Sequence, residues 1–152
     1  MPRYYSINPE NIAMPVPPFI LKEVPPDVVA FASIRNTVGW SNPELDVLQN
    51  SIDSSLFWVS AYDKSELVGC GRVIGDGAMY FYIQDVLVHP LYQNRGLGSQ
   101  IMHSINQYIT LNCPIGATVG LLAAHGKEAF YQQYGFAPRD GQQLGLGMCK
   151  FV

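Results

Sequence analysis

Charged side chains are scarce in this sequence, and long apolar runs are absent from it. Charged residues make up 14% of the 152 positions, the net charge is −3, and the nine lysines and arginines are spread thinly from Arg3 to Lys150. A protein that follows a nucleic-acid backbone needs clustered basic residues, so nucleic acid is not an expected partner. No apolar run approaches the roughly 18 residues that a membrane-spanning helix needs, so no membrane association is expected.

Cysteine is also scarce. Cys70, Cys113 and Cys149 are odd in number and widely spaced, without the CxxC pairs of zinc sites or the even count of disulfide frameworks. No combination of His, Cys and Asp has the spacing of metal ligands, so no metal is expected. The first residues contain no apolar segment followed by a small-residue cleavage site. These features predict reduced thiols, and the cytoplasm is the expected location.

The order of apolar patterns predicts one layered α+β or α/β domain over residues 1–152. Five prolines within residues 1–18 predict an extended N-terminal arm. Strands are predicted at about 19–23, 56–62, 67–74, 79–88, 119–123 and 144–151, and helices at about 27–40, 43–51, 98–111 and 126–134. This order indicates a mixed central β-sheet flanked by about four helices.

The stretch Tyr92–Ile109 changes from a loop with two glycines into a helix with one apolar face. A helix N-terminus leaves about four backbone N–H groups without partners and carries about half a positive charge, so it favours an anion. Gly96 and Gly98 remove the side chains that would keep a phosphate from these donors. The spacing fits neither GxxxxGK[ST] nor GxGxxG. Taken alone, such a pattern more often marks a plain strand-to-helix turn.

Two separate segments resemble the GNAT superfamily of acyl-CoA N-acyltransferases. The family signature, Q/R-x-x-G-x-G/A, opens the helix after the fourth strand, and Gln93-Asn94-Arg95-Gly96-Leu97-Gly98 matches all of its fixed positions. The segment EAFYQQYGF, residues 128–136, is similar to the family's A-x-x-F/L-Y-x-x-x-G-F motif on the helix after the fifth strand. The element order also agrees with the family's fold, so the resemblance covers roughly residues 19–151.

The resemblance implies acetyl-CoA as co-substrate. It implies that backbone amides of the glycine loop hold the pyrophosphate, and that main-chain groups of two strand valines pair with the pantetheine arm as an added strand would. Arg95 either contacts a phosphate or points into solvent. The implied cofactor-binding residues are Val86, Val88, Gln93, Asn94, Arg95, Gly96, Leu97, Gly98 and Ser99.

Tyr131 occupies the position of the family's conserved-motif tyrosine and is the expected general acid. A phenol with a pKa of about 10 is protonated at neutral pH and could protonate the leaving thiolate. The alternative is that Tyr131 only shares an apolar helix face with Phe130 and Tyr134, and Tyr134 itself is expected in the core.

The general base is harder to assign. Many relatives have Glu or His where Tyr82 or Gln84 stands, and neither residue here is a strong base. Asp85 is the carboxylate on this strand, and a β-bulge could turn it toward the substrate. A structural role for Asp85, and a water chain polarised by Tyr82, Gln84 and a carbonyl group, are the alternatives. Strict alternation predicts Tyr80, Tyr82, Gln84 and Val86 on one face and Phe81, Ile83, Asp85 and Leu87 on the other.

The resemblance places the acceptor between the first two helices and the middle strands. Trp40, Tyr80, Tyr82 and Gln84 are therefore the expected substrate-binding residues. Aromatic walls with few charges suit a hydrophobic or aryl amine, or a cationic head on a ring face, better than a polyamine. The expected function is N-acetylation of a primary amine of a small molecule, by direct attack in a ternary complex. A non-catalytic acyl-CoA-binding module and a protein acetyltransferase for Lys or N-termini are the alternatives, and a homodimer is left open.

Overall fold

The first helix begins where the sequence predicts it. The side chain of Asp27 accepts hydrogen bonds from the N–H groups of Val29 and Ala30 at 2.9 and 3.0 Å, which satisfies two donors that a helix start leaves free. After the helix, Gly39 adopts a left-handed backbone with φ of 82° and turns the chain toward the second helix. Local sequence therefore fixes both ends of this helix.

The computed structural model describes residues 19–152, so the predicted N-terminal arm, residues 1–18, lies outside the described residues. A short 3₁₀ turn, η2 (Pro90–Tyr92), precedes the glycine loop. The helices are α1 (Val28–Thr37), α2 (Leu45–Asp53), α3 (Leu97–Asn112) and α4 (Glu128–Gln132). The strands are β1 (Ile20–Lys22), β2 (Phe57–Asp63), β3 (Glu66–Gly75), β4 (Tyr80–Val88) and β5 (Thr118–Leu121).

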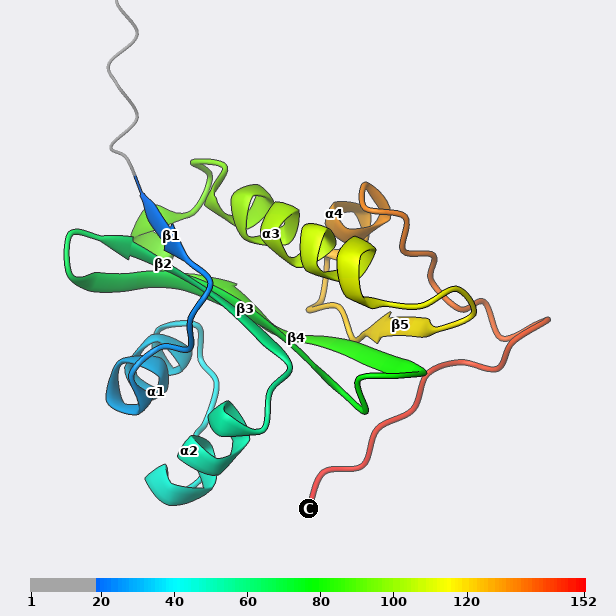
Figure 1. Ribbon diagram of the computed structural model, residues 1–152, viewed down its shortest axis with the longest axis horizontal. Coiled ribbons are helices and arrows are strands. Elements are labelled where there is room, and N and C mark those ends of the chain that lie inside the picture. Colours follow the sequence, from blue (N-terminus) through cyan, green and yellow to red (C-terminus); the bar gives the residue numbers. More distant parts are fainter. Residues whose placement is uncertain (1–18) are drawn as a thin grey trace, which may run out of the picture.

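The strands form one mixed sheet in the order β1-β2-β3-β4-β5. The first three pairs are antiparallel, whereas β4 and β5 run parallel from Tyr80↔Thr118 to Ile83↔Leu121. Because β5 ends at Leu121 while β4 continues to Val88, the second half of β4 has no strand beside it on that side (Figure 1). This opening positions the candidate site.

Two apolar clusters pack against the two faces of the sheet. The helix α3 buries Leu97, Ile101, Met102 and Ile105 on one face, and α1 and α2 bury Phe31, Ile34, Leu48 and Ile52 on the other. Figure 1 shows α3 and α4 on one side of the strands and α1 and α2 on the opposite side. The predicted fold class, a mixed sheet flanked by four helices within the described residues, is confirmed.

The predicted alternation along β4 is wrong beyond Gln84. The register shifts between Cys70↔Leu87 and Arg72↔Gln84, so Asp85 and Val86 together oppose Gly71, which is a β-bulge. Asp85 has a left-handed φ of 52°, and the extra residue turns it onto the α1 side beside Gln84. Val86 consequently packs on the α3 side of the sheet, on the opposite face from Gln84.

The strand predicted at residues 144–151 is also absent. The described tail beyond Phe136 contains no helix or strand. Leu144, Leu146 and Met148 are 61%, 66% and 94% exposed, so their alternating pattern buries no face. Glycines at 145 and 147 weaken extended pairing, and the four residues of β5 offer only a short edge to pair with.

Candidate functional site

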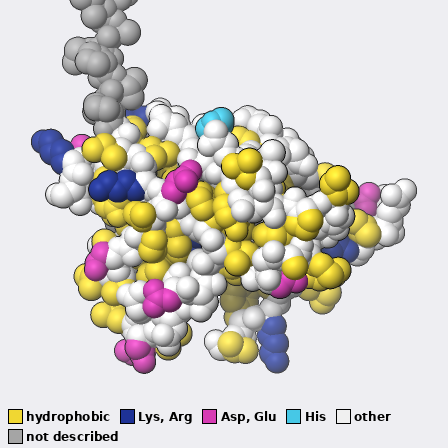
Figure 2. All heavy atoms as spheres, viewed as in Figure 1, with side chains coloured by type: hydrophobic (Ala, Val, Ile, Leu, Met, Phe, Trp, Pro, Cys, Tyr) yellow, Lys and Arg dark blue, Asp and Glu magenta, His cyan; other side chains and the backbone are white. Residues whose placement is uncertain are grey.

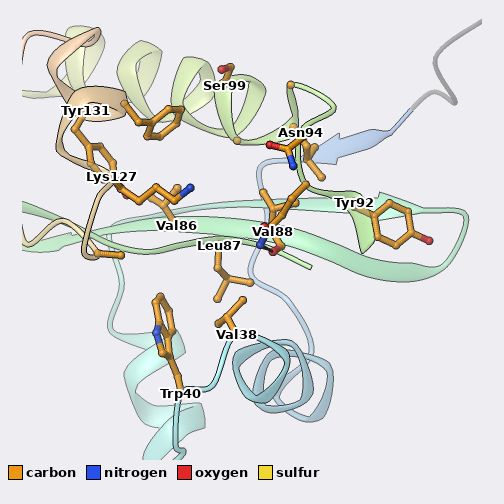
Figure 3. Close-up of a pocket in the computed structure, with 16 residues that line it drawn as sticks. Val38, Trp40, Val86, Leu87, Val88, Tyr92, Asn94, Ser99, Lys127 and Tyr131 are labelled. Carbon is orange, nitrogen blue, oxygen red and sulfur yellow. Dashed lines mark hydrogen bonds between the residues drawn. The ribbon is translucent and has the colours of Figure 1, made fainter. Parts of the chain in front are cut away.

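A cleft of about 460 Å³ lies beside the unpaired half of β4. Figure 3 shows Val38 and Trp40 on its α1–α2 side, Lys127 and Tyr131 on its α4 side, and the strand between them. The cleft therefore passes the edge of the sheet and reaches both layers of helices. The lining residues are Val38, Trp40, Val86, Leu87, Val88, Tyr92, Gln93, Asn94, Gly96, Leu97, Gly98, Ser99, Ala124, Lys127, Phe130 and Tyr131.

The backbone of β4 presents to this cleft an edge that pairs with no strand. The N–H of His89 donates to the carbonyl oxygen of Val68 on β3 at 2.9 Å. Alternate residues of a strand direct their N–H and C=O groups to the same side, so those of Val86 and Val88 point away from β3. The side-chain amide of Gln93 donates to the carbonyl oxygen of Val88 at 3.0 Å, which agrees with that direction. An extended ligand could pair here as an added strand would.

The loop before α3 has the backbone geometry of an anion-binding turn. Asn94 and Gly96 have left-handed φ values of 61° and 79°, and Gly96 is the N-cap without a side-chain cap. Gln100 donates to the carbonyl oxygen of Gly96 at 3.1 Å, which is the first bond of the helical ladder. The N–H groups of residues 97–99 precede this bond and point out of the helix end. Such a turn at a helix N-terminus favours a phosphate.

Gly98 keeps the space between α3 and α4 open. A Cβ atom built on Gly98 would lie 3.7 Å from Cζ of Phe130 and 3.9 Å from Cγ2 of Val88. A methyl group has room at these distances, but a larger side chain would extend into the cleft. Leu97, which precedes Gly98, is 1% exposed and packs the turn against the core.

Lys127 is a lining residue that the sequence patterns did not single out. Among the described residues that line the cleft, it has the one formally charged side chain, and Figure 3 shows it extending toward Val88. Neither ion pair in the described part of the chain involves it. It directly precedes α4, where the family motif marks no lysine. The predicted cation, Arg95, does not line the cleft; its guanidinium group lies 5.5 Å from the centre of the Tyr92 ring.

Tyr131 lines the cleft from α4 and packs against aromatic rings. Its ring centre lies 5.1 Å from that of Phe130 and 6.4 Å from that of Phe136. Burial raises the pKa of Tyr131 above its usual value, and the nearby Tyr82 phenol raises it further. The phenol is therefore protonated at neutral pH, the state that a proton donor needs. Tyr134 packs against Phe130 at 5.4 Å and does not line the cleft.

The bulge in β4 turns Asp85 away from the cleft. Its Oδ1 accepts a hydrogen bond from Nη1 of Arg35. Its Oδ2 accepts a hydrogen bond from Nε of Arg72 and also lies 2.8 Å from Nη2 of the same arginine. The carboxylate is fully buried and does not line the cleft. Because both oxygens are held by guanidinium groups, this side chain cannot reach an amine in the cleft. The expectation that a bulge would turn Asp85 toward the substrate is wrong, and the structural alternative fits the geometry.

Trp40 is the one predicted acceptor-side residue that lines the cleft. Tyr80, Tyr82 and Gln84 are absent from its wall, because they lie on the part of β4 before the bulge, and Tyr80 is 60% exposed. Val38, which follows α1, joins Trp40 in the wall. The predicted aromatic row on β4 is therefore not the surface that meets the cleft.

Comparison with known proteins identifies the family. Residues 53–138 match the family model described as an acetyltransferase (GNAT) domain. The chain belongs to the GNAT family. The resemblance seen in the two sequence motifs is thereby confirmed.

Relatives of known sequence support the same family. An uncharacterized ycf52-like N-acetyltransferase from Prochlorococcus marinus is 30% identical over 114 residues, which cover 72% of this chain and 62% of the relative. This GNAT chain spans about three fifths of the length of the curated relatives that it matches.

Solved structures share the fold. A Staphylococcus aureus protein described as a probable acetyltransferase has a TM-score of 0.79 and 30% identity, covering 87% of this chain and 99% of that one. A GNAT family acetyltransferase from Streptococcus pneumoniae has a TM-score of 0.73 and 25% identity, covering 88% and 98%.

Residues 19–152 contain neither a cluster of metal-ligating side chains nor a membrane-spanning helix. In that range, no group of three or more His, Cys, Asp and Glu side chains is arranged to hold a metal ion. The helices of the same range are too short or too polar to cross a bilayer.

Proposed function

We propose that this GNAT protein is an acetyl-CoA-dependent N-acetyltransferase that acetylates a small primary amine by direct attack in a ternary complex. The observation that carries the proposal is the continuity of the cleft. It joins the glycine turn, the open edge of β4 and the wall formed by Val38 and Trp40. A donor on one side of the sheet and an acceptor on the other would meet at the edge of β4.

The donor would occupy the α3–α4 side. The N–H groups of residues 94–99 would hold the diphosphate, because those of residues 97–99 point out of a helix N-terminus and residues 94–96 form the turn that leads into it. The main-chain groups of Val86 and Val88 would pair with the amide groups of the pantetheine arm. Lys127 would add a positive charge beside the phosphates, and no neighbouring carboxylate among residues 19–152 forms an ion pair with it.

The chemistry needs three proton transfers. A primary amine with a pKa of about 10 must lose one proton before it attacks. Asp85 is turned away, so that proton would leave through water. The amine nitrogen attacks the thioester carbonyl carbon, and the C–S bond breaks as the thiolate leaves. Tyr131 would donate its phenolic proton to that sulfur, since burial raises the pKa of Tyr131 and keeps the donor protonated. The second proton of the attacking nitrogen would pass through water to the Tyr131 phenolate, which leaves a neutral amide.

The acceptor would be small and largely apolar. Val38, Trp40, Leu87 and Ala124 give the cleft apolar walls, and within the described part of the chain no carboxylate lines it. A polyamine or a lysine-rich peptide needs acidic groups to balance its charges, and Lys127 would repel such a substrate. The wall therefore suits an aryl or alkyl amine that carries a single amino group.

A non-catalytic acyl-CoA-binding module is the second candidate. The observation that favours it is the lining of the cleft, which among residues 19–152 contains no His, Asp or Glu that could act as a general base. Such a module would bind acetyl-CoA through the same turn and strand edge without releasing coenzyme A.

Thiol release distinguishes the two candidates. The purified protein would be given acetyl-CoA with a panel of aryl and alkyl monoamines, diamines and lysine-containing peptides. Amine-dependent release of free thiol with the monoamines, above the rate of hydrolysis, would support the enzyme. Binding of acetyl-CoA without such release would support the module. Mass spectrometry that found acetylated peptides while the monoamines stayed unmodified would show a protein acetyltransferase instead.

A further inference from the structure

A buried polar network joins the bulge of β4 to the two helices below the sheet. Asp85 lies at its centre and bridges Arg35 of α1 and Arg72 of β3. Arg72 continues the network to α2, donating to the carbonyl oxygen and to the hydroxyl oxygen of Ser51 at 3.0 and 2.9 Å. Two guanidinium groups thus share a single carboxylate inside the protein.

Arg35 makes contacts beyond those needed to balance Asp85. Its Nε donates to Oδ1 of Asn42 at 2.8 Å, and its Nη2 donates to the main-chain oxygen of Ser41 at 2.9 Å. Its guanidinium carbon also lies 5.3 Å from the centre of the Trp40 ring. One nitrogen of this group, Nη1, therefore bonds to the sheet through Asp85, and the other two bond to the connection after α1.

The connection after α1, residues 38–42, takes its other hydrogen bonds from α1 itself. The N–H groups of Val38 and Trp40 donate to the carbonyl oxygen of Arg35 at 3.2 and 3.1 Å. The side-chain amide of Asn42 donates to the carbonyl oxygen of Ala32 at 2.9 Å. These bonds fix the connection relative to α1. The polar path from the connection to β4 runs through Arg35 and Asp85.

We infer that Asp85 and Arg35 are positioning residues for the acceptor. The carboxylate fixes the guanidinium group, and the guanidinium group fixes the connection that presents Val38 and Trp40 to the cleft. The inference rests on the proposed function, because it assigns this wall to the amine. A misplacement of about 1 Å at a reacting group can cost about 100-fold in rate. Loss of the anchor should therefore weaken use of the amine and leave coenzyme A binding intact.

Two substitutions separate this role from a merely structural one. Arg35→Lys keeps a positive charge opposite Asp85 but lacks the planar fork that reaches Ser41 and Asn42. Asn42→Ala removes the other end of the anchor and leaves the ion pair in place. The exposed Arg139→Lys is the matched control.

Steady-state kinetics and calorimetry with an acetylated amine from the panel give the main result. Both variants should raise the KM for the amine by about 10-fold and lower kcat, as expected for a displaced substrate wall. The Kd for coenzyme A should stay at its native value, and Arg139→Lys should change nothing. An unchanged KM for the amine in both variants, or an equal rise in the Kd for coenzyme A, would overturn the inference.

Fluorescence of Trp40 tests the anchor without turnover. In a Trp58→Phe background Trp40 is the remaining tryptophan, and quenching by acrylamide should increase when Arg35→Lys is added. Identical quenching with and without Arg35→Lys would overturn the positioning role. If the native protein acetylates no amine, the proposed function has failed, and the quenching result alone decides whether Arg35 anchors Trp40.

Discussion

The two sides of the cleft are built in different ways. The proposed donor side is local: Gln93, Asn94 and residues 96–99 line the cleft around the start of α3. The proposed acceptor side depends on side chains from distant parts of the chain, since Arg35 and Asp85 are 50 positions apart. A site made of local backbone tolerates many side chains. A site that depends on a long-range network tolerates fewer substitutions, because the loss of one side chain leaves its partners without their hydrogen bonds.

Charged side chains lie both on the surface and inside the protein. Figure 2 shows those on one face as single, separated side chains between apolar side chains and backbone. The two arginines of the network are instead nearly buried, with side chains 16% and 9% exposed. Charged side chains therefore also form ion pairs inside the protein, between the sheet and α1.

The largest expected effect is on the stability of the fold. Asp85→Asn leaves Arg35 and Arg72 buried without their shared carboxylate, and breaking a buried ion pair costs about 3–5 kcal/mol. Urea unfolding should show a loss of that size in the free energy of unfolding. Asp53→Asn, at an exposed carboxylate that accepts from Gln49 at 2.9 Å, is the control. Equal stabilities of the two variants would contradict a central role for Asp85.

Tyr131→Phe tests the chemical step where the two sides meet. Loss of the proton donor should lower kcat by at least about 10-fold, because general acid catalysis contributes roughly 10²–10⁴-fold. The Kd for acetyl-CoA should stay near its native value. Tyr134→Phe removes a hydroxyl group from the same aromatic cluster and should leave kcat unchanged. An unchanged kcat for Tyr131→Phe at saturating substrate would remove Tyr131 from this role.

Gly98→Val tests the backbone character of the donor side. A branched side chain on Gly98 would extend from the α3 start toward Phe130 and Val88 and would occupy the space of the diphosphate. Calorimetry should show the Kd for coenzyme A rising by about 10-fold, equivalent to about 1.4 kcal/mol. Gly98→Ala, whose methyl group has room, should bind coenzyme A nearly as well as the native protein. Native affinity in Gly98→Val would show that the phosphate binds elsewhere.

Lys127→Gln should have the smallest effect. The lysine is at the rim of a solvent-accessible cleft, where one charge contact contributes about 1 kcal/mol or less. The Kd for coenzyme A should therefore rise by about 3-fold at low salt, and the difference should shrink as salt screens the contact. Lys22→Gln, on the distant strand β1, is the control. A salt-independent difference would argue against a charge contact with phosphate.

The donor side could be predicted from the sequence because its signals are local. Gly96 and Gly98 stand at a fixed spacing before an apolar helix face, and both line the cleft. The element order and the capped start of α1 at Asp27 were likewise predicted, since periodicity and capping depend on neighbouring residues.

The acceptor side could not be predicted in the same way. The bulge at Asp85 depends on pairing with Gly71, and the direction of Asp85 depends on two arginines from other elements. The face that strict alternation predicts for Val86 is therefore wrong. Lys127 carried no motif signal, and only the packing of α4 against the cleft reveals it. The strand predicted at 144–151 is absent because glycines at 145 and 147 weaken extended pairing and β5 offers only a short edge.

Amide spectra of the protein titrated with coenzyme A would test the central claim most directly. The claim is that the main-chain N–H groups of residues 94–99 bind the diphosphate. Two-dimensional ¹H–¹⁵N spectra should show the largest shifts at these amides, with further shifts at Val86 and Val88. Coenzyme A that leaves these amides unshifted, in a sample whose dispersed spectrum shows that the protein is folded, would contradict the account.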